Sequence, residues 1–257
     1  APQMSTLTVD NLTVTFGGIR ALDDVSFHVD PGEVFAIIGP NGAGKSTIFN
    51  AISRFYQPKA GSIRFHGAEI LKLKPHEVVN LGVARTFQNI ELFERATVLQ
   101  NLLVGCHSKM QRSLVREFFF LPGVRRGEHE ARRKVEEVLD LLDMQHLRDA
   151  RVADLAYGAR KNVELARALC AGPELLLLDE PASGLNPEET RDMSFWLQDI
   201  KEELGVTILM VEHDMSLVGR IADRVLALSG GQVLTVGSVA DVQADERVQT
   251  AYLGAAA

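Results

Sequence analysis

The sequence is poor in cysteine, the residue on which disulfide frameworks and many metal clusters depend. Its 257 residues include two cysteines, Cys106 and Cys170, and both lie in apolar stretches that favour helix. We expect two buried thiols. The count argues against a disulfide scaffold or a cysteine-based metal site.

Long apolar runs and an excess of positive charge are also missing. No run approaches the roughly 18 apolar residues of a membrane-spanning helix, and no N-terminal signal peptide is visible. The formal net charge is −7, whereas proteins that wrap nucleic acid usually carry a basic excess. We therefore expect no nucleic-acid partner. The apolar content of 46% supports a globular chain of one large domain or two small ones.

A phosphate-binding pattern is present near the N-terminus. Residues 39–46 read Gly-Pro-Asn-Gly-Ala-Gly-Lys-Ser and fit G-x-x-x-x-G-K-[ST]. An apolar run at 33–38 predicts a buried strand before the loop, and residues 44–54 predict a helix after it. Glycines let backbone N–H groups point at a polyphosphate, and the helix N-terminus adds its dipole. Lys45 then supplies a charge for the phosphates and Ser46 an oxygen for Mg²⁺.

Two carboxylates follow a second apolar run. Four leucines at 175–178 precede Asp179 and Glu180, which predicts a central strand of a parallel sheet with acidic residues at its C-terminal end. That position suits Asp179 as a Mg²⁺ ligand. Glu180 is the candidate for orienting or deprotonating an attacking water. His213 follows the apolar run 206–211, where a lone histidine is more often part of the core.

Other segments predict antiparallel strands and an amphipathic helix. Alternation of apolar and polar residues predicts strands at 7–16, 19–29 and 62–66, bounded by glycine and proline turns. Residues 224–236 predict a hairpin. Apolar residues spaced three and four apart predict a helix over 128–144. An antiparallel frame around a phosphate loop is unusual for a simple doubly wound fold.

These motifs, in this order, resemble the ATP-binding cassette (ABC) ATPases over about residues 7–254. Leu155-Ala156-Tyr157-Gly158-Ala159 lies where that family has its signature Leu-Ser-Gly-Gly-Gln, and 183–186 lies at its dimer-crossing loop. The resemblance implies an α/β P-loop ATPase with a RecA-like parallel-sheet core, an antiparallel β subdomain and a helical subdomain. It implies one domain over 5–254, with the helical subdomain inserted at about 90–172. Residues 1–4 are expected to be flexible or left over from cloning.

The resemblance also implies roles for individual residues. Phe16 would stack on adenine, Gln88 would contact Mg²⁺ and sense the membrane part, and His213 would touch the γ-phosphate. The expected nucleotide-binding residues are Phe16, Gly39, Pro40, Asn41, Gly42, Ala43, Gly44, Lys45, Ser46 and Thr47. The expected catalytic residues are Glu180, His213, Gln88 and Lys45, and the expected Mg²⁺ ligands are Ser46, Gln88 and Asp179.

The signature segment departs from the family pattern. Ala156 replaces the serine whose hydroxyl would donate to the γ-phosphate held by a second subunit, and Ala159 replaces the glutamine. Losing one hydrogen bond to a charged group costs about 1.5–3 kcal/mol. This favours a heteromeric pair with unequal sites. The crossing loop also ends in Asn186 where the family has aspartate.

Branch-level features resemble the ATPase subunit of branched-chain amino acid importers. They are the stretch 84–89 (Ala-Arg-Thr-Phe-Gln-Asn), Tyr157, the stretch 183–187, the long segment between Cys106 and Glu128, and the ending 251–254. The resemblance predicts an ATP-hydrolysing subunit that powers import of branched-chain or related amino acids, with ATP and Mg²⁺ as cofactors. Expected partners are a second ABC ATPase subunit, integral membrane permease subunits and, indirectly, a solute-binding protein. The expected location is the cytoplasmic side of the cell membrane, as a peripheral subunit.

Three alternatives stay open at this point. The chain would also suit an exporter ATPase, for example for an envelope lipid. A non-transport ABC ATPase of nucleic-acid repair or translation usually carries two cassettes or long insertions, and this chain has one phosphate loop and is acidic. A small-molecule kinase is disfavoured by the signature segment and His213.

Overall fold

A mostly parallel sheet forms the centre of the computed structural model, which describes residues 5–86, 91–110 and 123–254. Its strand order is β10-β9-β3-β8-β7-β6, and only β10 runs antiparallel to its neighbour. Its strands are β3 (Val34–Ile38), β6 (Val83–Arg85), β7 (Leu175–Asp179), β8 (Thr207–Val211), β9 (Arg224–Ser229) and β10 (Gln232–Gly237). Every residue of β3, β7 and β8 is buried, because parallel strands are covered on both faces.

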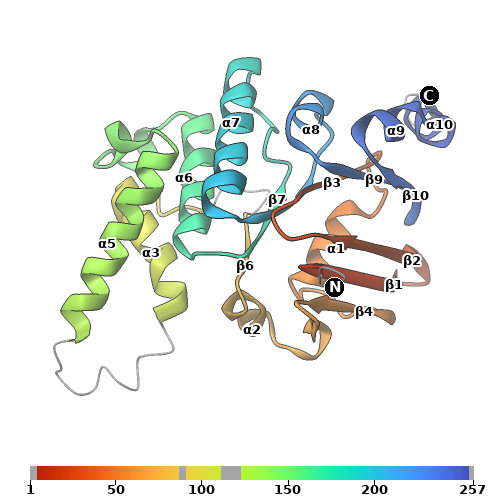
Figure 1. The fold of residues 1–257 in the computed structure, drawn as a ribbon, viewed down its shortest axis with the longest axis horizontal. Coiled ribbons are helices and arrows are strands. Elements are labelled where there is room, and N and C mark those ends of the chain that lie inside the picture. Colours follow the sequence, from red (N-terminus) through yellow and green to blue (C-terminus); the bar gives the residue numbers. More distant parts are fainter. Residues whose placement is uncertain (1–4, 87–90, 111–122, 255–257) are drawn as a thin grey trace.

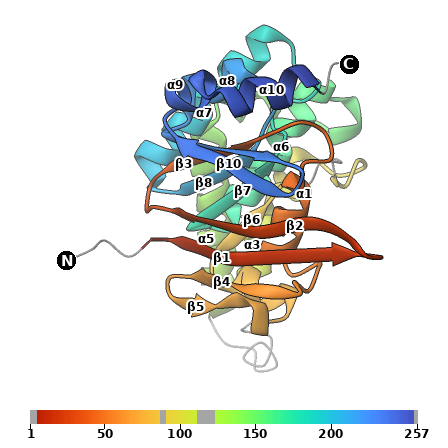
Figure 2. The ribbon, with the colours of Figure 1, turned by 90° about the vertical axis from the view of Figure 1, so that its right-hand side faces the viewer.

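A second, antiparallel sheet has the strand order β2-β1-β4-β5. Its strands are β1 (Leu7–Phe16), β2 (Ile19–Val29), β4 (Ala60–Phe65) and β5 (Ala68–Glu69). Figure 2 shows it on one side of the central strands, with α8, α9 and α10 on the other. Burial alternates along β1, as expected for a sheet with one face on the core. Together with α1 (Lys45–Ile52) this sheet covers the central-sheet side chains of Phe35, Ile37 and Leu177.

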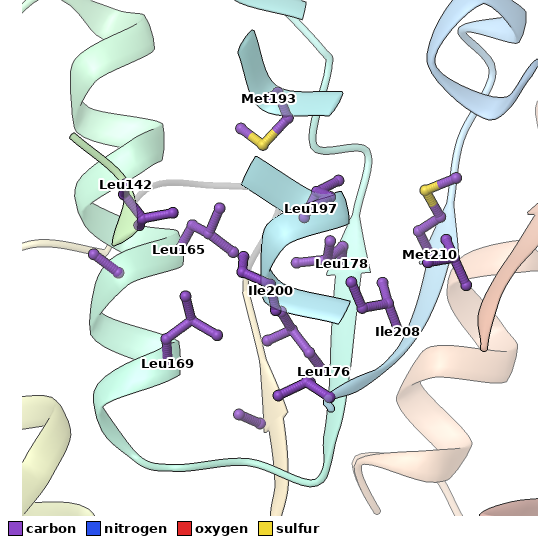
Figure 3. Close-up of a cluster of buried hydrophobic side chains, with 14 of the residues drawn as sticks. Leu142, Leu165, Leu169, Leu176, Leu178, Met193, Leu197, Ile200, Ile208 and Met210 are labelled. Carbon is purple, nitrogen blue, oxygen red and sulfur yellow. The ribbon is translucent and has the colours of Figure 1, made fainter. Parts of the chain in front are cut away.

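The opposite face of the central sheet is covered by helices. Because successive strand residues point to opposite faces, Leu176, Leu178 and Ile208 pack against α6 (Tyr157–Cys170) and α7 (Pro187–Leu204). Figure 3 shows this cluster, to which Leu165 and Leu169 of α6 and Leu197 of α7 contribute. Helices α3 (Val98–Met110) and α5 (Gly123–Leu141) pack beyond α6, at the end of the molecule away from the antiparallel sheet (Figure 1).

Helix ends follow their sequence signals closely where a cap is present. Asn186 caps α7 with its side chain and Pro187 occupies the first turn, so the helix begins at 187 and runs to 204. The hydroxyl of Thr97 accepts from the Gln100 N–H at 3.2 Å and so caps α3. In contrast, α5 begins five residues before the predicted 128 and ends at 141. The left-handed φ of 52° at Asp143 is incompatible with a helix that continues to 144.

The remaining elements are short. The other helices are α2 (Pro75–Asn80), α8 (Met215–Ile221), α9 (Val239–Ala244) and α10 (Glu246–Gly254), and 3₁₀ turns occupy Ile70–Lys72, Gln145–Leu147 and Val152–Asp154. Among the helices described, none combines the length and the apolar character needed to cross a lipid bilayer. Cys106 and Cys170 are buried free thiols, which confirms that prediction.

Candidate nucleotide and catalytic site

The phosphate loop leaves β3 and enters α1 with glycines at its two tightest points. A Cβ on Gly39 would lie 2.2 Å from the carbonyl oxygen of Leu228, and one on Gly44 would lie 2.7 Å from that of Ala21. The loop is therefore pressed against β9 and β2, and only glycine fits at these positions. Gly44 has φ 106° and no side chain caps α1. The first N–H groups of this helix thus have no intrahelical or capping acceptor.

The side chain of Lys45 folds back onto the phosphate loop and binds two of its carbonyl oxygens. Its Nζ donates to the carbonyl oxygens of Gly39 at 2.6 Å and Pro40 at 3.0 Å. Burial lowers the pKa of Lys45, while the nearby carboxylates of Glu180 and Asp179 oppose this shift. The structure therefore brings together the lysine of the loop and the two carboxylates at the end of β7.

Asp179 is buried and paired with a cation that sequence analysis missed. Its Oδ2 lies 2.8 Å from Nη2 of Arg85, at the end of β6, whose Nη1 also donates to Oδ1 of Asn50 at 2.8 Å. The second carboxylate oxygen, Oδ1, is buried and has no hydrogen-bond partner among the described residues. Such an atom suits a bound cation, because a buried anionic oxygen without a partner is costly. Gln88 lies outside the described residues.

Glu180 and His213 meet beside this carboxylate. Glu180 has φ 51°, a left-handed conformation, and its N–H donates to the carbonyl of Val211 at 2.9 Å. Its Oε1 lies 3.9 Å from Nδ1 of His213, close enough for both groups to contact one small ligand but too long for a direct hydrogen bond. His213 is 58% exposed at its side chain, so the core interpretation of this histidine is wrong.

A further buried carboxylate, Glu212, holds the loop that carries His213. Its oxygens accept from the N–H groups of Ala182 at 2.7 Å, His213 at 2.9 Å and Asp214 at 3.1 Å. Burial raises the pKa of Glu212, and these backbone donors oppose the shift. Sequence analysis missed Glu212, although an acidic residue at the end of an all-apolar strand was a signal. It ties the segment after Glu180 to the segment of His213.

Phe16 lies at the end of β1 with an exposed ring. The ring of Tyr56, which sequence analysis missed, meets it edge-on, with ring centroids 4.8 Å apart and planes at 71°. Both rings are partly exposed. Two exposed aromatic rings offer a surface on which a flat base can stack, so adenine binding by Phe16 stays a prediction.

The signature segment forms the start of α6 and contacts the crossing loop. Ala156 is the N-cap residue without a side-chain cap, and Tyr157 is half exposed. A Cβ on Gly184 would lie 2.8 Å from the ring of Tyr157, and one on Gly158 would lie 2.4 Å from Oε1 of Glu189. These contacts join the segment to 183–189 and not to the phosphate loop. Asn186 accepts from the N–H groups of Glu188 and Glu189 with its side chain and so caps α7, a role that the aspartate of the family pattern would fill equally well.

The chain matches two models of known protein families. Residues 22–183 match the family model described as ABC transporter, and residues 232–257 match that of the branched-chain amino acid ATP-binding cassette transporter. The chain belongs to the ABC transporter family. It is 40% identical over 250 residues to the high-affinity branched-chain amino acid transport ATP-binding protein BraF of Pseudomonas aeruginosa, covering 97% of this chain and 98% of BraF. It is 36% identical to the corresponding LivG protein of Escherichia coli K12, with the same coverage.

Solved structures of the family share the fold. A cassette of an ABC transporter in its ADP conformation is 33% identical, has a TM-score of 0.85 and is matched over 98% of this chain and 99% of its own. A nucleotide-free cassette is 31% identical, with a TM-score of 0.82 over 97% of this chain and 99% of its own. The predicted ABC-type ATPase fold, with parallel core, antiparallel sheet and helical part, is thereby confirmed.

Proposed function

We propose that this ABC ATPase is the ATP-hydrolysing subunit of an importer of branched-chain or related amino acids. The observation that carries the proposal is the similarity, over 97% of the chain, to ATP-binding proteins of branched-chain amino acid transport. The positions of three side chains support ATP hydrolysis. Glu180 lies near Lys45 of the phosphate loop, and its Oε1 is 3.9 Å from Nδ1 of His213. An exporter or a non-transport ABC protein has no comparable support.

ATP would bind with its phosphates in the loop 39–47. Backbone N–H groups of the loop and the open N-terminus of α1 would donate to the phosphate oxygens. Lys45 already lies over the loop, so it would exchange its two carbonyl acceptors for phosphate oxygens. Phe16 and Tyr56 would form the surface for the adenine ring.

The residues at the end of β7 fit a magnesium ion. Ser46, Asp179 and Gln88 are the proposed ligands, and the partnerless Oδ1 of Asp179 is the atom of this structure that supports the choice. Oxygen ligands of this kind are those that Mg²⁺ prefers. When bound, the ion would neutralise charge on the β- and γ-phosphates.

Glu180 would orient and deprotonate the attacking water, and His213 would contact the γ-phosphate. Their side chains are 3.9 Å apart and both are partly exposed, so water and phosphate can enter between them. Arg85 and Glu212 would act indirectly, the first by holding Asp179 and the second by holding the loop of His213.

A second ABC ATPase subunit would complete the site. A dimeric cassette of the family is 25% identical to this chain, with a TM-score of 0.75 over 91% of this chain and 98% of its own, and supports such a pair. In the proposed pair, the segment 155–159 of one subunit would face the nucleotide of the other. Ala156 has no hydroxyl group, so the backbone N–H groups at the start of α6 would donate to that nucleotide instead.

The pair makes ATPase activity depend on concentration. We expect little ATP hydrolysis by the isolated chain when it is dilute and a rising rate per chain over about a hundredfold increase in concentration, because assembly follows mass action. Phosphate release per chain measures this. A rate per chain that does not change with concentration would contradict a site shared between subunits.

An apolar cavity is the docking site that we propose for a permease subunit. It has a volume of about 380 Å³ and lies between α2, β6, α3 and α6. Phe55, Val79 and Val104 on its rim are exposed large hydrophobic residues, and exposed apolar patches often mark interaction sites. We expect the chain to be a peripheral subunit on the cytoplasmic side of the membrane. Its helical part, about 90–172, and Gln88 would pass motion to the permease, and a solute-binding protein would deliver the amino acid.

Uptake by cells tests the proposed solute. Deletion of the gene from the native host is expected to lower uptake of radiolabelled leucine, isoleucine or valine by at least about tenfold, and the wild-type gene is expected to restore it. Restoration with the Glu180→Gln variant is expected to fail, because transport would need hydrolysis. Unchanged uptake of all three amino acids in the deletion strain would reject this solute class.

A further inference from the structure

One lysine of the signature helix is bound to the backbone of the catalytic segment. Nζ of Lys161, on α6, donates to the carbonyl oxygen of Glu180 at 3.0 Å and to that of Pro181 at 3.2 Å. The side chain is partly buried, and burial lowers the pKa of Lys161, while the carboxylates of Glu212, Glu164 and Glu180 oppose this. Since an ammonium group has donors only, two carbonyl acceptors at the end of a buried strand suit it well.

The segment bound by Lys161 includes a residue in an unfavourable backbone conformation. Glu180 has φ 51°, a left-handed conformation that costs a residue with a Cβ about 1–2 kcal/mol. Such a conformation persists only where the surroundings impose it. Here the N–H of Glu180 is bound to Val211 of β8, its carbonyl is bound to Lys161, and the N–H of Ala182 is bound to Glu212.

The same turn of α6 also contacts the crossing loop. Tyr157 and Lys161 are four residues apart and therefore share one face of the helix. The Tyr157 ring packs on Gly184, and the Lys161 ammonium lies 5.8 Å from the centre of that ring. The N-terminal turn of α6 is thus attached to the segment 180–184 at two points. That turn carries the signature segment, which in the proposed pair faces the nucleotide of the second subunit.

We propose that Lys161 is a positioning residue for hydrolysis, which fixes the backbone of Glu180 so that its carboxylate stays beside His213. Lys161 also links the backbone of Glu180 to the start of α6. A nucleotide that is held by the second subunit and contacts the start of α6 would therefore affect the position of the Glu180 carboxylate. This inference rests on the proposed roles of Glu180 and of the paired subunits. Lys161 itself touches neither water nor phosphate in this scheme.

Lys161→Met is the informative variant, because methionine keeps much of the length and apolar stem but has no donor. Lys201→Met, on α7, is the control, since the Lys201 side chain is 28% exposed and its Nζ is also bound, to Asp223 at 2.8 and 2.9 Å, but away from the residues of the site. Turnover at saturating ATP, the KM and Kd for ATP, and thermal unfolding are measured for both. Each substitution is then repeated in a Glu180→Gln background, where residual hydrolysis is followed in single turnovers of radiolabelled ATP.

We expect Lys161→Met to lower kcat by about 10- to 100-fold, while the Kd for ATP stays within about threefold and the melting temperature matches that of Lys201→Met. In the Glu180→Gln background the same substitution is expected to have no further effect, because it acts through the carboxylate that is already missing. Lys161→Arg keeps the charge and the donors and is expected to restore most of the turnover. If the methionine variant does not fold, the arginine and glutamine variants at 161 give the same comparison.

Two results would overturn the inference. One is a kcat for Lys161→Met equal to that of Lys201→Met. The other is an equal loss with and without Glu180, which would show that Lys161 acts on stability or on another group. Wild-type turnover by the Glu180→Gln single variant would instead remove the proposed role of Glu180, and the inference with it. That single variant therefore distinguishes the two failures.

Discussion

Glu180→Gln is expected to bind ATP within about threefold of the wild-type affinity and to hydrolyse it at least about 100-fold more slowly. Glutamine has the same size and leaves Lys45, Asp179 and the loop as they are. Its amide cannot take a proton from water, and a positioned base typically contributes about 10²- to 10⁴-fold to the rate. Equilibrium ATP binding and phosphate release, measured on the same preparation, separate the two effects.

Glu174→Gln is the control for this experiment. Glu174 lies just before the other end of the same strand, where it is exposed and paired with His66 at 3.0 Å. An exposed pair of this kind contributes little, so this variant is expected to bind and hydrolyse ATP as the wild type does. Turnover by Glu180→Gln within a few-fold of the wild type would reject Glu180 as the base.

Gly39→Ala is expected to weaken ATP binding by at least about 100-fold and to lower the melting temperature. The new Cβ would lie 2.2 Å from the carbonyl oxygen of Leu228, far inside van der Waals contact. Leu228 is fully buried on β9, which is hydrogen-bonded to strands on both sides, so the loop must move instead. Movement would displace the carbonyl of Gly39 that holds Lys45. ATP affinity and thermal unfolding are the measurements.

Gly67→Ala separates this clash from the general cost of replacing a glycine. Gly67 lies in the turn between β4 and β5 with φ 80°, and a Cβ there would meet no atom within 4 Å. This variant is expected to lose about 1 kcal/mol of unfolding free energy and to keep its ATP affinity. Equal ATP affinities for the two alanine variants would contradict the argument that contact with β9 shapes the loop.

Much of the site could be predicted because its chemistry is local in sequence. The phosphate loop needs a strand, eight residues and a helix in succession, and β3 and α1 provide them close to the predicted bounds. The carboxylates at the end of β7 follow four leucines directly. The helix predicted over 128–144 is correct in kind but not in its bounds, because α5 begins at 123 and ends before the left-handed Asp143.

The residues that sequence analysis missed are those whose partners are remote in the chain. Arg85 pairs with Asp179 across 94 positions, and Glu212 binds the N–H of Ala182 across 30. Lys161 lies on α6, and its acceptors are backbone carbonyls of another segment. Backbone acceptors have no sequence signature, so no pattern could have indicated this contact.

The sequence by itself determined which groups are the candidates for the chemistry, because glycine spacing, a lysine and strand-end carboxylates are set by neighbouring positions along the chain. The tertiary structure decided how they meet. Pairing of Asp179 with Val211 in the parallel sheet sets the ends of β7 and β8 side by side, and this brings Glu180 within 3.9 Å of His213. The left-handed backbone of Glu180 depends on its hydrogen bonds to the Val211 carbonyl of β8 and from Lys161 of α6, which exist only once the sheet and its covering helix have packed.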